Sequence, residues 1–153
     1  MSLRETLQND LKEAMRQRDD VRRSVLRLAL TAIKNAEVEA GAPLDDEAIQ
    51  RVLRQQVKQR RESIEEFERG NRPDLVAREQ AEIGVLQTYL PQQLSRDEIV
   101  AMARRVIADT GATSPRDLGK VMPRLMAEVD GRAEGRTVNQ IVQELLAGRA
   151  PSQ

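Results

Sequence analysis

The chain has 153 residues, of which 39% are hydrophobic and 33% are charged, and its formal net charge is zero. This balance is typical of a globular helical protein with a modest core, and zero net charge excludes a global field that would draw the protein to nucleic acid or a membrane. Cysteine and histidine are absent, which excludes disulfides, thiolate chemistry, most zinc sites and imidazole acid–base catalysis. We therefore expect no metal site and no cofactor.

The predicted elements are all helices. Apolar residues recur at helical spacing along nearly the whole chain, and no segment shows the sustained alternation of a strand. Ser2 with Glu5 and Ser95 with Glu98 have the spacing of capping boxes. The pattern predicts helices over residues 2–15, 21–40, 45–70, 73–90, 95–111, 114–129 and 136–146.

The fold class expected from these elements is all-α, with two different helical bundles. A break at Pro91–Leu94 separates four longer helices from three shorter ones. We expect a four-helix N-terminal bundle over residues 1–92 and a three-helix tail domain over residues 93–149. Residues 150–153 are expected to fray. Phe67 and Tyr89 are the only aromatic residues, so both cores must be aliphatic.

The N-terminal segment bears on location. Its first twenty residues are charged throughout and contain no uninterrupted apolar run. This pattern is neither that of a signal peptide nor that of a membrane span. We expect a cytoplasmic protein without a membrane partner.

One stretch near the end, DLGKVMPRLMAEVDGRAEGRTVNQIVQELL, contains two glycines four positions apart, Gly131 and Gly135. A nucleotide-binding P-loop needs a wider glycine spacing, a following Lys-Ser or Lys-Thr, and a preceding strand. We interpret the stretch as a corner between two helices. Gly131 is expected to take a left-handed conformation after the first helix, and Gly135 to let the backbone approach a phosphate.

Basic residues surround this corner and form the first candidate RNA-binding site. Three of them, at i, i+4 and i+8, lie on the helix before the corner, and two flank the corner itself: Arg116, Lys120, Arg124, Arg132 and Arg136. Free N–H groups at a helix N-terminus beside arginines favour a phosphate contact. The alternative is a plain corner with solvated arginines.

A rival basic face lies on the third predicted helix, where residues 48–61 contain no acid. Four cations fall on one side of it: Arg51, Arg54, Lys58 and Arg61. The alternative is a solvated face held by pairs such as Glu47–Arg51. Arg60 lies nearer the apolar stripe and is expected to extend along the surface or to pair with a carboxylate between helices.

Catalysis finds little support in the residues. No serine has an obvious base beside it, and the carboxylates are scattered over solvated helix faces. We assign no catalytic residue and expect no independent enzymatic activity.

Two stretches resemble the GatB/YqeY family: the C-terminal stretch quoted above and RRESIEEFERGNRPDLVAREQAEIGVLQTYLPQQLSRDEI. That family includes the tail of the B subunit of glutamyl- and aspartyl-tRNA amidotransferase, and this chain resembles a stand-alone YqeY-like protein. The resemblance implies two helical bundles and a role in gripping tRNA, away from the amidotransferase chemistry.

The expected partner is therefore tRNA or another structured RNA, bound without a small-molecule cofactor. The family label, a carbon–nitrogen ligase with glutamine as amido-N-donor, is interpreted as inherited from the larger enzyme. The alternative is a protein–protein interaction module in translation without direct RNA contact.

Overall fold

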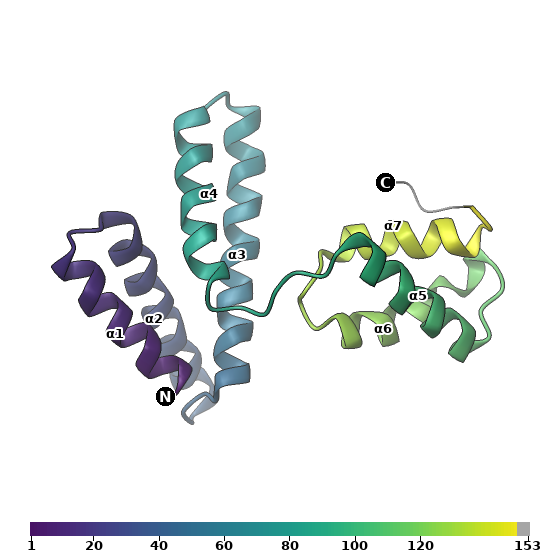
Figure 1. Cartoon of the computed structure of the whole chain (residues 1–153), viewed down its shortest axis with the longest axis horizontal. Helices are drawn as coiled ribbons and strands as arrows, with labels where there is room; N and C mark the ends of the chain where they lie inside the picture. Colours follow the sequence, from purple (N-terminus) through teal and green to yellow (C-terminus); the bar gives the residue numbers. More distant parts are fainter. Residues whose placement is uncertain (150–153) are drawn as a thin grey trace. The chain divides into compact units, whose positions relative to one another are not determined.

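The computed structural model describes residues 1–149, and within this range it contains helices and no strands (Figure 1). The predicted all-α class is confirmed. The expected fraying of residues 150–153 lies outside the described residues. The helices are α1 (Leu3–Arg16), α2 (Asp20–Ala40), α3 (Asp46–Arg69), α4 (Pro73–Gln87), α5 (Arg96–Thr110), the 3₁₀ turn η1 (Pro115–Asp117), α6 (Leu118–Val129) and α7 (Gly135–Leu146).

Contacts between Cα atoms divide the chain into two compact units, Met1–Leu90 and a second unit that begins at Pro91. Each unit has its own cluster of buried hydrophobic residues. The predicted boundary between residues 92 and 93 stays a prediction.

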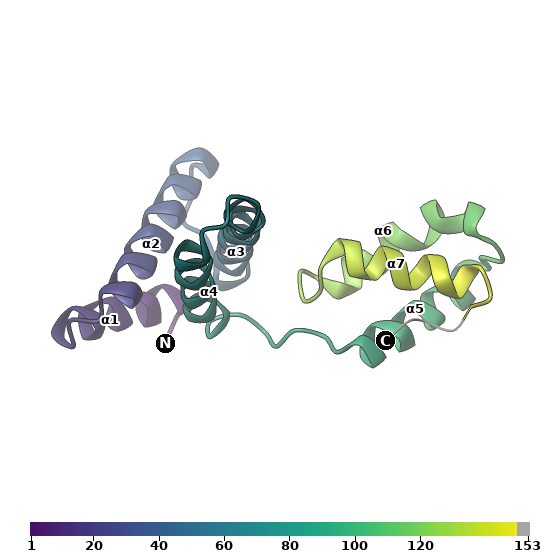
Figure 2. The same ribbon diagram turned by 90° about the horizontal axis from the view of Figure 1, so that it is seen from above.

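The first unit consists of two helical hairpins, α1 with α2 and α3 with α4 (Figures 1 and 2). The core is aliphatic: Leu7, Ala14, Val25, Leu26, Ala29, Ile33, Ile49, Leu53, Val57, Ile83 and Leu86. The sequence repeats Leu3, Leu7, Leu11 and Met15 every four residues, which predicts one buried stripe on α1, and this prediction was wrong at its end, since Met15 is 47% exposed and Ala14 is buried. At 3.6 residues per turn, a residue twelve positions after Leu3 has rotated by about 120° away from it.

Side chains cap the starts of α1, α2, α3 and α5, while α4, α6 and α7 have no side-chain cap. Ser95 and Glu98 form a capping box with both of its hydrogen bonds, and the Ser2 hydroxyl accepts from the Glu5 N–H at 3.2 Å. The second helix is capped by Asp19, whose carboxylate accepts from the Arg22 N–H at 3.1 Å.

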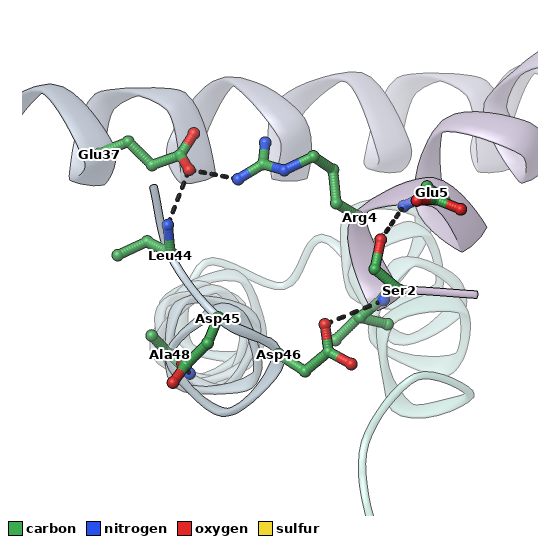
Figure 3. A network of polar contacts seen from close by, with 9 residues as sticks. Ser2, Arg4, Glu5, Glu37, Leu44, Asp45, Asp46 and Ala48 are labelled. Atoms are coloured by element: carbon green, nitrogen blue, oxygen red, sulfur yellow. Dashed lines mark hydrogen bonds and ion pairs between the residues drawn. The ribbon is translucent and has the colours of Figure 1, made fainter. Parts of the chain in front are cut away.

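A polar network joins three helix ends of the first unit (Figure 3). The Glu37 carboxylate accepts a hydrogen bond from the Arg4 guanidinium and another from the Leu44 N–H at 2.8 Å. The Leu3 N–H donates to Asp46 Oδ1 at 3.0 Å. These bonds tie the start of α1 to the end of α2 and the start of α3.

A buried ion cluster lies between α3 and α4. Arg60 Nη1 bonds to Glu82 and lies 3.5 Å from Glu79 Oε2, which confirms that Arg60 pairs with carboxylates between helices. Its side chain is 11% exposed and that of Glu82 is 8% exposed. Arg78, whose side chain is largely exposed, places its Nε 3.3 Å from the other Glu82 carboxylate oxygen, Oε1. Two buried charges are stable here because each faces its opposite.

Replacing Glu82 with Ala should lower the free energy of unfolding by about 3 kcal/mol, because Arg60 then keeps a buried charge without its main partner. Urea denaturation measures the change. Glu66→Ala is the matched control, since Glu66 is exposed on α3. The double variant Arg60→Met/Glu82→Leu should regain most of the loss. Equal stability of Glu82→Ala and Glu66→Ala would show that the cluster contributes nothing.

Tyr89 connects the last residues of the first unit to its first helix. Its hydroxyl donates to Asp10 Oδ2 at 2.5 Å, which links the turn after α4 to α1. Burial and the hydrogen bond to Asp10 raise the pKa of Tyr89 to about 12.

The raised pKa of Tyr89 predicts a loss of stability in alkali. Below pH 10 the phenol is neutral in both states and the Asp10 bond is intact. Between pH 10 and about 12 only the unfolded chain releases the proton, so the free energy of unfolding should fall as pH rises. Because Tyr89 is the one tyrosine and there is no tryptophan, phenolate absorbance reports its titration directly. Tyr89→Phe should lack this part of the alkaline decline, and phenolate formation near pH 10 in the folded protein would contradict the assignment.

The second unit packs α5, α6 and α7 around another aliphatic core (Figure 2). Its buried residues are Ile99, Ala103, Val106, Ala112, Val121, Leu125, Val129, Val138, Ile141, Val142 and Leu146. The sixth predicted helix begins differently from expectation: Pro115–Asp117 is a 3₁₀ turn, and the α-helix proper starts at Leu118. No helix within residues 1–149 is long and apolar enough to cross a membrane.

Candidate nucleic-acid interface

The corner between α6 and α7 is built from two consecutive left-handed residues. Asp130 has φ 47° and Gly131 has φ 77°, so the left-handed conformation predicted for Gly131 is confirmed. Asp130 adopts it as well, which the sequence reasoning missed, although a short polar side chain tolerates that region. A Cβ atom at Gly135 would meet only Met126 Cε at 3.7 Å, an ordinary contact, so the corner does not require glycine there.

Arg132 holds the chain that precedes α5. Its Nε donates to the Gln92 carbonyl at 3.0 Å, and its own carbonyl accepts from the Leu94 N–H at 2.8 Å. The two bonds fasten residues 92–94 to the corner. The predicted phosphate ligand thus already has a structural role, which sequence reasoning missed because the partners are 40 positions apart.

Two of the three cations before the corner face an acid. Lys120 Nζ lies 3.6 Å from Asp117 Oδ1, and Arg124 Nη2 lies 3.9 Å from Asp109 Oδ2. The Thr113 N–H donates to Asp117 at 2.9 Å and lowers the pKa of this carboxyl group, and the charge of Lys120 lowers it further. These carboxylates reduce the positive potential that a phosphate would meet.

Arg116 and Arg136 lie at the two ends of the predicted track. Arg116 is exposed in the 3₁₀ turn. That turn has about three residues per turn, so Arg116 does not continue the helical line of Lys120 and Arg124. Arg136 is exposed in the first turn of α7, which has no acidic residue and no side-chain cap. The structure therefore does not place the five predicted tail cations on one continuous helical track.

The rival face on α3 lies on an unbroken helix, so its four cations keep the spacing read from the sequence: Arg51, Arg54, Lys58 and Arg61. Arg51 Nη2 lies 3.1 Å from Glu47 Oε1, which confirms that predicted pair. Lys58 is exposed.

The two basic regions differ in how many acids accompany them. Residues 116–136 contain five cations and four acids, which leaves a net charge of +1. Residues 48–61 contain five cations and no acid. Arg60 is neutralised by Glu82 and Glu79, and Arg51 pairs with Glu47, which directly precedes the segment. The α3 segment therefore has the higher density of cations, five in 14 residues against five in 21.

Comparison with known proteins matches residues 4–146 to the model of a family described as Yqey-like protein. A relative in Lachancea thermotolerans, named altered inheritance of mitochondria protein 41, mitochondrial, is 39% identical over 112 residues; the match covers 71% of this chain and 60% of the relative. The protein of the same name in Pyrenophora tritici-repentis is 33% identical over 149 residues, which cover 94% of this chain and 80% of the relative.

The expectation of a cytoplasmic protein is contradicted by these relatives. At 30 to 39% identity, they carry names that state a mitochondrial location. The physical reason for the error is that a charged N-terminal segment without an apolar run argues against a signal peptide and a membrane span. It does not distinguish the cytoplasm from another aqueous compartment.

Removing the Arg132 side chain should loosen the segment before α5. In Arg132→Ala, the Leu94 amide should exchange hydrogen about fivefold faster, because one hydrogen bond contributes roughly 1 kcal/mol. Hydrogen exchange followed by NMR measures the rate at this amide. Arg116→Ala removes an exposed cation that lies outside residues 92–94 and should leave the rate unchanged. Identical rates in both variants would show that the Gln92 bond does not hold the segment.

Proposed function

We propose a function from the premise that the chain belongs to the family of YqeY-like proteins. In this proposal the chain is a non-catalytic RNA-binding accessory module, and tRNA is the expected ligand. The resemblance of its two quoted stretches to the tRNA-gripping tail of the amidotransferase B subunit supports the choice of RNA.

The observation that carries the proposal is the cation-rich face of α3, where residues 48–61 contain five cations and no acid. Its outer cations, Arg51 and Arg61, are ten positions apart, which corresponds to about 15 Å along a helix. A row of that length contacts several phosphates of one backbone, and each contact releases a counterion. The same cations carry no base-specific arrangement, so they position RNA without reading its sequence.

The composition limits the mode of recognition. Proteins commonly bind single-stranded RNA by stacking its bases on aromatic rings. The chain has two aromatic residues. Tyr89 is hydrogen-bonded to Asp10, and Phe67 on α3 has no second ring beside it in the sequence to form a stacking surface. Recognition through shape and phosphate contacts, as for structured RNA, fits the chain better. The tail cations form the second candidate surface, weakened by their acidic neighbours.

A protein–protein interaction module remains the second candidate. Zero net charge favours it, as does the pairing of Lys120 and Arg124 with acids. The carbon–nitrogen ligase label is not proposed as an activity of this chain alone. Two of its serines, Ser2 and Ser95, cap helices, and Ser63 donates to the Gln59 carbonyl.

Filter binding of bulk tRNA over a range of salt concentrations tests the proposal. The α3 variant Arg51→Ala/Arg54→Ala/Lys58→Ala should weaken binding and reduce the slope of log K against log salt by roughly two to three units, one for each lost phosphate contact. The fold should persist, because Arg51 and Lys58 are exposed and Arg54 is partly exposed, and surface charges contribute at most about 1 kcal/mol each.

Two triple variants complete the experiment. Lys12→Ala/Arg18→Ala/Arg69→Ala removes the same charge from exposed positions outside both surfaces, and its slope should equal that of the parent. Lys120→Ala/Arg124→Ala/Arg136→Ala tests the tail. A loss confined to the tail variant would move the site to the second unit. If the parent shows no salt-sensitive binding, the RNA proposal fails and the interaction module replaces it.

A further inference from the structure

A cleft of about 360 Å³ opens in the second unit, between the end of α5, the loop after it and α7. Most of its lining is apolar or small: Ile107, Ala108, Gly111, Ala112 and Leu145. The volume lies at the lower end of the range of roughly 300–1,000 Å³ found for ligand pockets. It suits one or two side chains and is too small to enclose a large ligand.

The cleft has one charged residue in its lining, and that residue is a cation. Arg104 lines it together with Thr113, and the lining includes no acid. Arg104 is exposed, and no ion pair or hydrogen bond of its guanidinium is found within residues 1–149. Its neighbour Arg105 differs, because both of its terminal nitrogens bond to the Glu128 carboxylate.

The walls of the cleft are held in place by bonds that do not involve a ligand. Gly111 ends α5 in a left-handed conformation with φ 72°. The Thr113 N–H donates to Asp117 Oδ2 at 2.9 Å, and the Thr110 hydroxyl donates to the Val106 carbonyl at 2.9 Å. Because these bonds already fix the cleft, binding a ligand there loses little conformational entropy of the protein.

We propose that this cleft docks a segment of a partner protein in which an aliphatic side chain neighbours an acidic one. The aliphatic group enters the apolar lining, and the carboxylate pairs with Arg104. Charge complementarity selects the acid, since the lining offers a cation without a competing anion. RNA does not fit this chemistry, because its phosphates meet one cation here and it offers no aliphatic side chain to the apolar lining. The inference does not depend on the proposed RNA-binding face, which lies in the first unit.

Selection from a phage-displayed library of random peptides tests the proposal with the full chain as bait. Counter-selection uses Ala108→Trp, which fills the cleft from an exposed position. Enriched peptides should pair Leu, Ile or Val with a nearby Asp or Glu. Arg104→Glu should weaken them by about fivefold or more, the equivalent of an exposed ion pair plus repulsion. Changing the peptide's acid to Lys should restore binding to Arg104→Glu.

The controls separate this docking from general charge effects and from other ligands. Lys12→Glu makes the same charge change in the first unit and should bind the selected peptides like the parent. Circular dichroism melting checks that Ala108→Trp and Arg104→Glu remain folded. Three results would overturn the proposal: no enrichment over the counter-selection, enriched peptides that ignore Arg104→Glu, or octanoate binding as tightly as the peptides. NMR shifts of Gly111 and Thr113 caused by tRNA, and not by peptides, would assign the cleft to RNA instead.

Discussion

The burial of aliphatic stripes is the constraint on which the structure depends. Every fully buried large side chain within residues 1–149 is Leu, Ile or Val, so each core is filled by many modest side chains and none by a ring. Such side chains contribute roughly 1.5–3 kcal/mol each when buried, and a unit reaches stability only when several helices close on one another. The second unit does this with three short helices, and its buried residues come from all three. Charged residues are consequently confined to the outer faces, except where Glu82 and Arg60 neutralise each other.

Features that repeat along the chain could be predicted from the sequence, because periodicity and capping are local. The spacing of Ile49, Leu53 and Val57 specifies the buried face of α3, and Ser95 with Glu98 specifies the start of α5. For Arg60 the sequence left two expectations open, extension along the surface or a pair with a carboxylate, and the structure shows the pair, with Glu82 and Glu79 of α4. The 3₁₀ turn at Pro115 escaped prediction, because proline favours the first turn of either kind of helix.

The candidate site was less predictable, since availability depends on partners from other helices. Arg124 and Arg116 look equivalent in the sequence. In the fold, Asp109 of α5 lies beside Arg124 and not beside Arg116. Arg104 and Arg105 are adjacent, and their environments differ because α6 presents Glu128 to the second. Arg132 shows the limit most clearly, since a backbone carbonyl is its partner and no residue pattern marks it. A list of cations therefore identifies possible phosphate ligands, and the fold decides which of them remain available.

Zero net charge also has a narrower meaning than the composition first suggests. At physiological ionic strength, charges are screened over about 8 Å, which is shorter than the roughly 15 Å that ten helical residues span. A phosphate near Lys58 therefore responds to the charges within about one and a half turns of α3, which include Arg54, Arg61 and Glu62, and hardly to charges farther away in the chain. The total charge excludes long-range steering toward RNA, but it does not exclude contact binding to a cation-rich helix face. One neutral chain can thus carry one surface that selects phosphates and another that selects an acidic, aliphatic segment.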